Sequence, residues 1–205
     1  MIAAILMSIL NFIKNIFKTD SAHQVGPKFQ PDPNAYYFHE DYYCQIEFLP
    51  KENFSAISKT ATEIIEHSEK TFDGHGWTGC YRRNESQVST KSKKYKMSEF
   101  ADMLFAEGFS EYPSVTTGYS TTVFPCDNTR AFRKQSIILC IDFKDGIVET
   151  IWQGDSPYKG DNEVYKSFLL ALAGKYNLLL ADWWKSIVVD ISNSNEIDKY
   201  FAYDE

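Results

Sequence analysis

The sequence predicts an α+β domain in which a mixed, mainly antiparallel sheet packs with three or four helices, plus an amphipathic N-terminal helix. The length of 205 residues gives one domain a substantial core and leaves little room for a second. Hydrophobic residues make up 43% of the chain and charged residues 24%, which is typical of a globular protein. Helical and strand periodicities follow one another without an internal repeat, in the approximate order α, linker, β, α, β, α, β, β, β, α, β, α.

Residues 1–18 form the expected N-terminal helix, and residues 19–34 form a linker that holds three prolines and lacks periodicity. As a helix, the first segment has a wide apolar face and one narrow polar stripe. The stripe consists of Ser8, Asn11, Asn15 and Lys18. We expect this helix to dock on the domain or on a partner. Two alternatives stay open: it lies on a membrane surface, helped by Lys14 and Lys18, or it is an atypical signal or anchor. Residues 35–205 are expected to form the single α+β domain.

Two kinds of periodicity predict the first strand and helix of this domain. Tyr42–Leu49 alternates between two sets of side chains, which indicates a half-buried strand, and Pro50 ends it. Asn53 is a suitable N-cap for the helix that follows. Seven residues at helical spacing give that helix a core face. They are Phe54, Ile57, Ala61, Ile64, Ile65, Ser68 and Phe72.

The middle of the chain is expected to contain a strand, a helix and a second strand. After a break at residues 73–76, the strand covers Trp77–Arg83, and the helix begins at Ser98 and stops at Gly108. Pro113–Pro125 is dense in Thr, Val and Tyr, which favours a strand. The inward side chains of the helix are expected to be Phe100, Ala101, Leu104 and Phe105.

A β-hairpin over Ser136–Trp152 is the strongest local signal. Its two apolar runs are joined by Asp145-Gly146, residues that readily adopt the positive φ angles of a type I′ turn. This turn sets the register of the strands. The expected pairs are Phe143 with Val148, Ile141 with Thr150, Leu139 with Trp152, and Asp142 with Glu149. The last pair carries like charges and therefore needs a nearby cation.

The last third of the chain predicts a helix, two strands and a short final helix. The first helix covers Asn162–Lys175, and the strands cover Leu178–Leu180 and Ile187–Val189. The final helix covers Asn195–Phe201 and is capped by Ser194. The core face of the first helix is expected to hold Val164, Phe168, Ala171 and Leu172.

Residues 74–79 read Gly-His-Gly-Trp-Thr-Gly and so match the G-x-G-x-x-G fingerprint of dinucleotide-binding folds. In those folds a strand precedes the motif and a helix begins within it, whereas here a helix precedes and a strand follows. We therefore interpret the glycines as a helix-to-strand turn and expect no cofactor. Gly118–Thr122 resembles a nucleophile elbow around Ser120 but lacks its second glycine.

The histidines and carboxylates leave one alternative open, which is an enzyme of unrecognised type, either hydrolase-like or metal-dependent. His39 is followed by Glu40 and Asp41, and strand alternation would place His39 and Asp41 on one side. A second acidic cluster, without calcium-loop spacing, consists of Asp155, Asp161 and Glu163. The simpler interpretation of His39 is an ordinary surface histidine. The simpler interpretation of the acidic cluster is that its carboxylates complement the dipole at a helix N-terminus. No set of His and Cys has zinc-finger spacing, so no metal site is predicted.

The net charge of −7 and the pI of about 5.2 disfavour nucleic acid as a partner and favour a basic one. Acidity is concentrated in Asp145–Glu205, which holds 11 acidic residues and five lysines. The basic run Tyr81–Lys96 is expected to be a solvated loop. Four widely spaced cysteines are expected to be reduced in a cytoplasmic protein, or to form two disulfides in a secreted one.

Asp182-Trp183-Trp184-Lys185 is a candidate recognition sequence. Adjacent tryptophans in a strand face opposite sides, so one is expected to be buried and the other exposed or partnered. An exposed tryptophan beside acids is a hot-spot composition for protein recognition. A carbohydrate platform and two core tryptophans stay open as alternatives.

The segments His39–Glu47, Asp182–Asp190 and Ile197–Tyr200, within an acidic α+β chain, suggest a family. In these features the chain resembles bacterial immunity proteins of polymorphic toxin and contact-dependent inhibition systems. This resemblance implies a non-enzymatic, cytoplasmic protein that binds a cognate toxin, expected to be basic, and neutralises it. The partner-binding residues are expected to be Asp155, Asp161, Asp182, Trp183 and Trp184. A membrane-surface accessory protein, addressed through residues 1–18, is a further alternative.

Overall fold

The computed structural model describes residues 32–83, 88–119, 122–154 and 161–203, all of which belong to the unit Pro31–Glu205. The helix expected over residues 1–18 lies outside the described residues, as does most of the linker. Ser120 of the elbow-like sequence lies outside them too. Within the described part of the chain, no helix is both long and apolar enough to cross a membrane.

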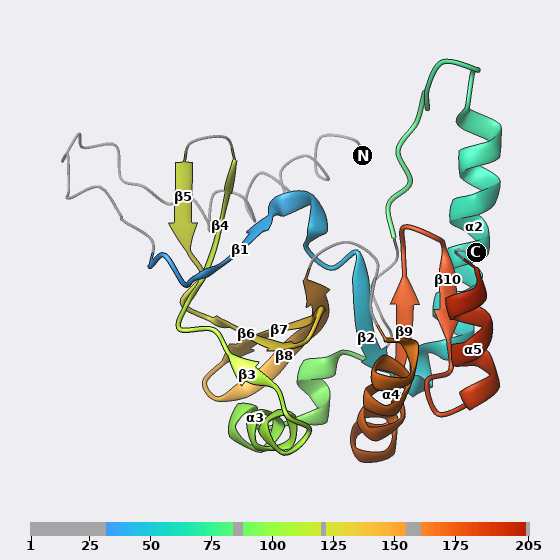
Figure 1. Ribbon diagram of the computed structural model, residues 1–205. Coiled ribbons are helices and arrows are strands. Elements are labelled where there is room, and N and C mark those ends of the chain that lie inside the picture. Colours follow the sequence, from blue (N-terminus) through green and yellow to red (C-terminus); the bar gives the residue numbers. More distant parts are fainter. Residues whose placement is uncertain (1–31, 84–87, 120–121, 155–160, 204–205) are drawn as a thin grey trace. The chain divides into compact units, whose positions relative to one another are not determined.

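Helices and strands are arranged as an α+β fold, which confirms the predicted class (Figure 1). The first half contains β1 (Tyr36–His39), the 3₁₀ helix η1 (Glu40–Tyr42), β2 (Ile46–Pro50), η2 (Lys51–Asn53), α2 (Phe54–Thr71), η3 (Thr90–Lys93) and α3 (Met97–Ala106). The second half contains β3 (Ser110–Glu111), β4 (Val115–Tyr119), β5 (Thr122–Pro125), β6 (Thr129–Lys134), β7 (Ile137–Lys144), β8 (Ile147–Gly154), α4 (Asn162–Tyr176), β9 (Leu178–Asp182), β10 (Ile187–Val189) and α5 (Ser194–Ala202).

The strands form two sheets. The larger has seven strands in the order β10-β9-β2-β8-β7-β6-β3, and all of its neighbouring pairs are antiparallel. The smaller has the order β1-β4-β5, in which β1 and β4 are parallel and β4 and β5 antiparallel. The sheet structure is therefore mixed and mainly antiparallel, as predicted.

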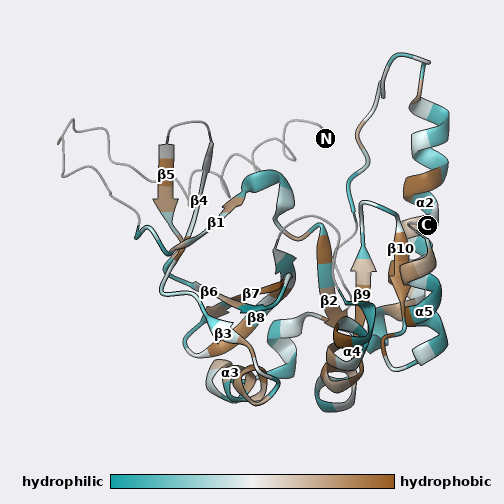
Figure 2. Cartoon of the chain, viewed as in Figure 1, coloured by the Kyte–Doolittle hydropathy of each residue, from teal (hydrophilic) through white to brown (hydrophobic). Residues whose placement is uncertain are grey.

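The seven-stranded sheet has a different cover on each face. On one face α3, α4 and α5 enclose the largest core, which includes Phe48 of β2, Phe100 of α3 and Phe168 of α4. On the opposite face the small sheet covers Cys140 and Trp152, while α2 covers a separate patch. That patch consists of Leu49, Ile57, Leu179 and Ala181. Figure 2 shows hydrophobic residues concentrated in the strands of the large sheet and in α4.

Only the first turns of α2 reach the core, which corrects the predicted core face. Among the expected residues, Ile57 and Ala61 are buried, and Thr60 joins them. Phe54, Ile65 and Phe72 are exposed by 36%, 46% and 53%. The apolar patch beneath α2 is small, so the outer turns of the helix find no sheet to cover. Nor does the Asn53 side chain cap α2, because its amide instead bonds to the backbone of Val88.

Two predicted strands are not regular. The strand expected over Tyr42–Leu49 begins only at Ile46, because the chain forms η1 and then turns at Cys44, whose φ is 55°. The segment expected as a strand over Trp77–Arg83 makes only an isolated bridge, between Trp77 and Phe72. It returns along α2 as extended chain without pairing in either sheet.

The β7–β8 hairpin has the predicted turn but a different register beyond it. Asp145 and Gly146 both adopt positive φ, at 52° and 74°, and Phe143 pairs with Val148. A bulge then shifts the ladder by one residue. The remaining expected pairs are therefore wrong: Asp142 faces Thr150, Ile141 faces Ile151, and Leu139 faces Gln153. The bulge also separates Asp142 from Glu149, which bonds to Lys91 instead.

The later helices lie close to their predicted bounds. In α3, Phe100, Ala101 and Leu104 are buried, whereas Phe105 is 46% exposed and so was wrongly placed in the core. In α4, Phe168 and Leu172 are buried as expected. The N-cap of α5 is Asn193, whose side chain accepts from the Asn195 amide, and not the expected Ser194.

Candidate functional site

Asp182 ends β9 and is fully buried, so it cannot contact a partner as expected. One carboxylate oxygen, Oδ2, accepts a 2.8 Å hydrogen bond from the Tyr200 hydroxyl of α5. The other, Oδ1, accepts one of 3.1 Å from the Lys185 amide. Burial raises the pKa of Asp182, and the Tyr200 hydrogen bond opposes that rise. The residue is thus an internal anchor that fixes the turn of residues 183–186 between β9 and β10.

Trp183 lies at the start of this turn and is half-buried. Its amide donates a 2.8 Å hydrogen bond to the Gln45 carbonyl, and its ring packs against the small core beneath α2. The Arg83 guanidinium carbon lies 4.7 Å from the ring centroid, a cation–π contact. These contacts make Trp183 a support for the turn and leave little of its ring for a partner.

Trp184 is 53% exposed, so its ring is open to a partner. Its ring meets that of Tyr42 edge-on, with 6.4 Å between ring centroids. Tyr42 ends η1, whose first residues, Glu40 and Asp41, are both exposed. We call Glu40, Asp41, Tyr42 and Trp184 the aromatic–acidic patch. Two segments about 140 residues apart in the chain meet there.

His39 caps η1, so it is not the strand neighbour of Asp41 that alternation predicted. Its Nδ1 accepts a hydrogen bond of 3.3 Å from the Asp41 amide and lies 3.3 Å from the Asp41 carboxylate. The Asp41 side chain is 74% exposed. This pair orders the start of η1 beside the patch, and water has access to the carboxylate.

The other predicted contacts are placed differently. The Asp161 carboxylate caps α4, where it accepts from the amides of Glu163 and Val164 at 2.9 and 3.3 Å. Asp155 lies outside the described residues. Trp184 is thus the exposed one of the two adjacent tryptophans, but nothing in the sequence indicated Tyr42 as its neighbour, because the contact depends on how η1 follows β1.

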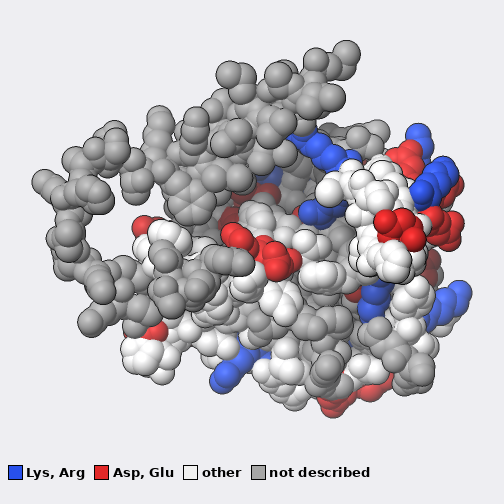
Figure 3. All heavy atoms as spheres, turned by 90° about the horizontal axis from the view of Figure 1, so that it is seen from above, with Lys and Arg blue, Asp and Glu red and all other residues white. Residues whose placement is uncertain are grey.

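Among the described acids of the C-terminal third, two pair with lysines and so do not add to one acidic surface. Asp190 pairs with Lys51 at 2.8 Å, and Asp198 pairs with Lys166 at 2.5 Å. On the face seen in Figure 3, acidic and basic side chains are intermixed. The local surroundings of each exposed aromatic residue therefore matter more than the net charge of the region.

A group of hydrogen-bonded polar side chains, most of them partly buried, lies on the sheet face where the covers formed by the small sheet and α2 meet. Asp142 Oδ2 accepts from the Tyr43 hydroxyl at 2.9 Å, and its Oδ1 accepts from Thr129 at 2.6 Å. Arg83 Nη1 donates to the Cys44 carbonyl at 3.2 Å and lies 3.7 Å from Glu47.

Burial raises the pKa of four groups in this cluster, Tyr43, Cys44, Glu47 and Asp142. Arg83 opposes the rise at Glu47. The Tyr43 hydroxyl and the Cys44 thiol are therefore held in their neutral forms, which suits hydrogen bonding and packing better than nucleophilic attack.

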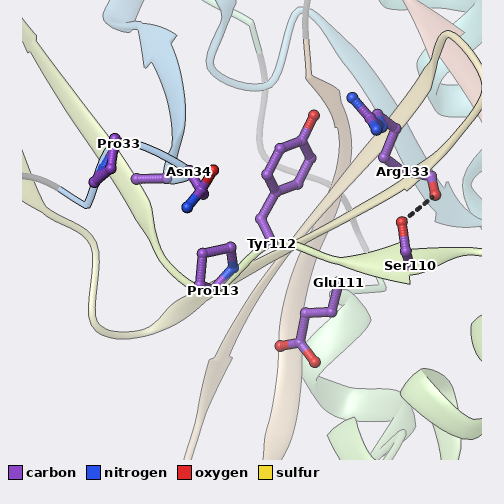
Figure 4. A pocket seen from close by; sticks show the side chains of 8 residues that line it. Pro33, Asn34, Ser110, Glu111, Tyr112, Pro113 and Arg133 are labelled. Atoms are coloured by element: carbon purple, nitrogen blue, oxygen red, sulfur yellow. Dashed lines mark hydrogen bonds between the residues drawn. The ribbon is translucent and has the colours of Figure 1, made fainter.

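A hollow of about 340 Å³ lies elsewhere, beside β3 and the residues that precede β1 (Figure 4). Tyr112 and Arg133 flank it, with the guanidinium carbon 5.7 Å from the ring centroid. Ser110 donates a 3.3 Å hydrogen bond to the Arg133 carbonyl. Neither His39 nor the Asp142 cluster lines this hollow. Among the residues that the structure describes, no three or more His, Cys, Asp or Glu side chains gather in a way that would hold a metal ion.

Comparisons with known proteins found no matching family model, no matching curated protein and no matching solved structure.

Proposed function

We propose that this chain is a non-enzymatic binding protein that neutralises a cognate protein toxin by direct contact, as bacterial immunity proteins do. The observation that carries the proposal is the exposed Trp184 ring, set against Tyr42, whose two preceding residues carry exposed carboxylates. Tryptophan and tyrosine are the residues most enriched at the energetic centres of protein interfaces.

The geometry of the turn supports this role. Asp182 and Trp183 hold residues 183–186 from beneath, so Trp184 is positioned before a partner arrives. A side chain that is already fixed loses less conformational entropy on binding. Internal hydrogen bonds thus hold a turn whose large aromatic ring is exposed to water.

Glu40 and Asp41 suggest the chemistry of the partner. They lie next to Tyr42 in the chain and are exposed. Carboxylates around an aromatic centre attract Lys and Arg and accelerate the encounter with a basic protein. We therefore propose that the patch binds a basic surface of the toxin and blocks its active site or its docking surface.

The free thiols of Cys44, Cys80 and Cys126 support placing this function in a reducing compartment, and we propose the cytoplasm.

Co-expression with the product of an adjoining toxin-like reading frame tests the proposal. The wild-type chain is expected to restore growth of the host and to bind the purified toxin. Trp184→Ala is expected to weaken binding by about 30-fold or more, since it truncates an interface centre. The double change Glu40→Lys and Asp41→Lys is expected to lower the association rate constant about tenfold at low salt.

Phe105→Ala is the matched control, because Phe105 is similarly exposed but lies on α3. It is expected to leave affinity and protection unchanged. The proposal fails if the wild-type chain gives no protection, or if the Trp184 and Glu40/Asp41 variants bind the toxin as tightly and as fast as wild type.

A further inference from the structure

Beyond Ala61 the outer turns of α2 and the chain that returns along them contribute no buried side chain to the hydrophobic cores. We call residues 62–83 the arm. Apolar burial is the main force that keeps a helix in a fold. The contacts that hold these residues in place therefore lie outside the hydrophobic cores.

The returning chain packs closely on the helix. The Tyr81 hydroxyl donates a 2.6 Å hydrogen bond to Glu63, and the Tyr81 ring meets that of His67 at 5.7 Å. A Cβ atom at Gly79 would lie 3.1 Å from Thr71 Cγ2, so a larger residue there would push the returning chain or Thr71 aside by a few tenths of an ångström. This contact gives the last glycine of the G-x-G-x-x-G sequence a role in packing.

The base of the arm is fastened to the domain at two points. Arg83 bonds to the Cys44 carbonyl and covers the Trp183 ring. Asn53 exchanges two hydrogen bonds with Val88, from Nδ2 to the carbonyl at 2.8 Å and from the amide to Oδ1 at 2.9 Å. The arm is thus anchored on both sides of its outer turn.

Phe72 and Trp77 form the tip, where they are 53% and 67% exposed with 5.7 Å between ring centroids. The indole Nε1 of Trp77 donates a 2.7 Å hydrogen bond to Ser68. Asp73 closes the turn by accepting from the amides of His75 and Gly76 at 2.9 Å each. These bonds hold two large apolar rings in water in a fixed arrangement.

Among the described residues, the side chains next to these rings that carry charge without an ion pair are acidic. Glu69 lies in the last turn of α2, three residues before Phe72, the C-cap of the helix, and this spacing brings side chains close together at a helix surface. Asp73 follows Phe72 directly and is exposed, and its backbone hydrogen bonds lower its pKa, so its carboxylate is charged at neutral pH. The nearby Lys70 pairs with Glu66 at 3.6 Å.

From this arrangement we propose that the arm tip is a second protein-docking site, which inserts Phe72 and Trp77 into an apolar pocket rimmed by Lys or Arg. Aromatic rings that are fixed in advance are suited to fill a pocket, and the carboxylates of Glu69 and Asp73 select a basic rim. The inference does not depend on the partner being a toxin or on the aromatic–acidic patch.

Charge argues against two other occupants. The tip of a second copy would bring Glu69 and Asp73 against the same residues, which repel. An anionic membrane surface attracts basic segments and would repel these carboxylates. A basic protein surface is the occupant that matches both the rings and their charged neighbours.

Selection from a displayed library of random 12-residue peptides tests the site without a known partner. Wild-type protein is the bait, and Phe72→Ala/Trp77→Ala is used for counter-selection. We expect the enriched peptides to carry large apolar residues flanked by Lys or Arg. A synthetic peptide of the consensus sequence is expected to lose about tenfold or more in affinity to Trp77→Ala. Asp73→Asn, which keeps the oxygen that closes the turn, and Glu69→Lys are expected to weaken it as well.

Ile65→Ala is the matched control, because Ile65 is 46% exposed on the same helix and lies outside the tip. It is expected to bind the peptide as wild type does, and so is Trp184→Ala. Circular dichroism is expected to show the wild-type unfolding temperature for Trp77→Ala, since the ring is exposed.

The inference is overturned if the enriched peptides bind without needing Phe72 and Trp77 of the protein, or if their own sequences lack Lys and Arg. So does a wild-type dimer in light scattering that Trp77→Ala makes monomeric, or binding to phosphatidylserine vesicles that Trp77→Ala abolishes. Peptides that depend on Trp184 alone also overturn it, while leaving the proposed function of the aromatic–acidic patch intact.

Discussion

The Tyr200 hydroxyl donates a 2.8 Å hydrogen bond to the carboxylate of Asp182, and both residues are buried. This bond joins α5 to the end of β9, directly before the turn that presents Trp184. A buried carboxylate must receive hydrogen bonds or pay a large desolvation penalty. The pair therefore links the stability of the C-terminal helix to the shape of the aromatic–acidic patch.

Tyr200→Phe is expected to destabilise the protein by about 1.5–3 kcal/mol, because it removes a hydrogen bond to a buried charged group. Urea unfolding at pH 7 measures the effect. Tyr203→Phe serves as the control, since Tyr203 is 63% exposed, and is expected to change stability by less than about 0.5 kcal/mol. Equal stability of Tyr200→Phe and wild type would show that the Asp182 carboxylate is satisfied without Tyr200.

The cost of Tyr200→Phe is expected to depend on pH. Burial raises the pKa of Asp182 in the folded state above the unfolded value of about 3.9, so its contribution to stability is largest in acid. That contribution falls as pH rises from the unfolded towards the folded pKa. Tyr200 stabilises the ionised form, so its removal raises the folded pKa further and costs more at pH 7 than at pH 4. Unfolding free energies at both pH values measure this, and a cost that is larger at pH 4 would contradict the assignment.

Local sequence signals predicted the fold where local forces decide it. The Asp145-Gly146 turn formed because both residues tolerate positive φ, and α4 formed because its apolar residues have helical spacing. The register beyond the turn was wrong, because a bulge between Asp142 and Phe143 shifts the ladder, and Glu149 bonds to Lys91, more than 50 residues away in the chain. No pattern within the hairpin contains that information.

For the candidate site, the sequence predicted Trp184 from composition and misplaced Asp182 for the same reason. Both were taken as surface residues of an acidic stretch, but β9 lies between β10 and β2 in the sheet, so its last residue is buried. The sequence did not predict the arm, because the apolar residues of α2 keep their helical spacing beyond the patch of the sheet that the helix covers. Periodicity reports what a helix can bury and not how far the sheet beneath it extends.

Two glycine substitutions are expected to change stability in opposite directions. A Cβ atom at Gly154 would overlap the Tyr36 hydroxyl and lie 2.9 Å from Tyr36 Cζ and 3.0 Å from Ile138 Cγ2. Gly154→Ala is therefore expected to cost about 1–3 kcal/mol through overpacking. Gly174 lies in α4 with nothing within 4 Å of its added Cβ, so Gly174→Ala is expected to stabilise by up to about 1 kcal/mol. Thermal unfolding of both variants gives the signs, and a stabilising Gly154→Ala would contradict the packing of β8 against β1.

Asn53→Ala is expected to release the base of the arm. Its fully buried amide makes both hydrogen bonds to Val88, so truncation leaves a backbone donor and acceptor unpaired at a cost of about 1–3 kcal/mol. Asn53→Asp keeps the acceptor for the Val88 amide, but it loses the donor and places a buried carboxylate against the Val88 carbonyl. Hydrogen exchange of the Val88 amide is expected to be faster than in wild type in both variants. Wild-type protection in both variants would show that another group holds Val88.

The four cysteines are expected to react with a thiol reagent in three phases. Cys80, on the arm, is exposed and reacts first in the native protein. Cys126 is partly buried, and burial raises its pKa to about 11, so its rate is expected to rise about tenfold per pH unit between pH 8 and pH 10. Cys44 and Cys140 are buried and are expected to react only after unfolding. Cys80→Ser removes the first phase alone, and a fast native thiol that survives this change would mean that one of the other three cysteines is more accessible than its burial allows.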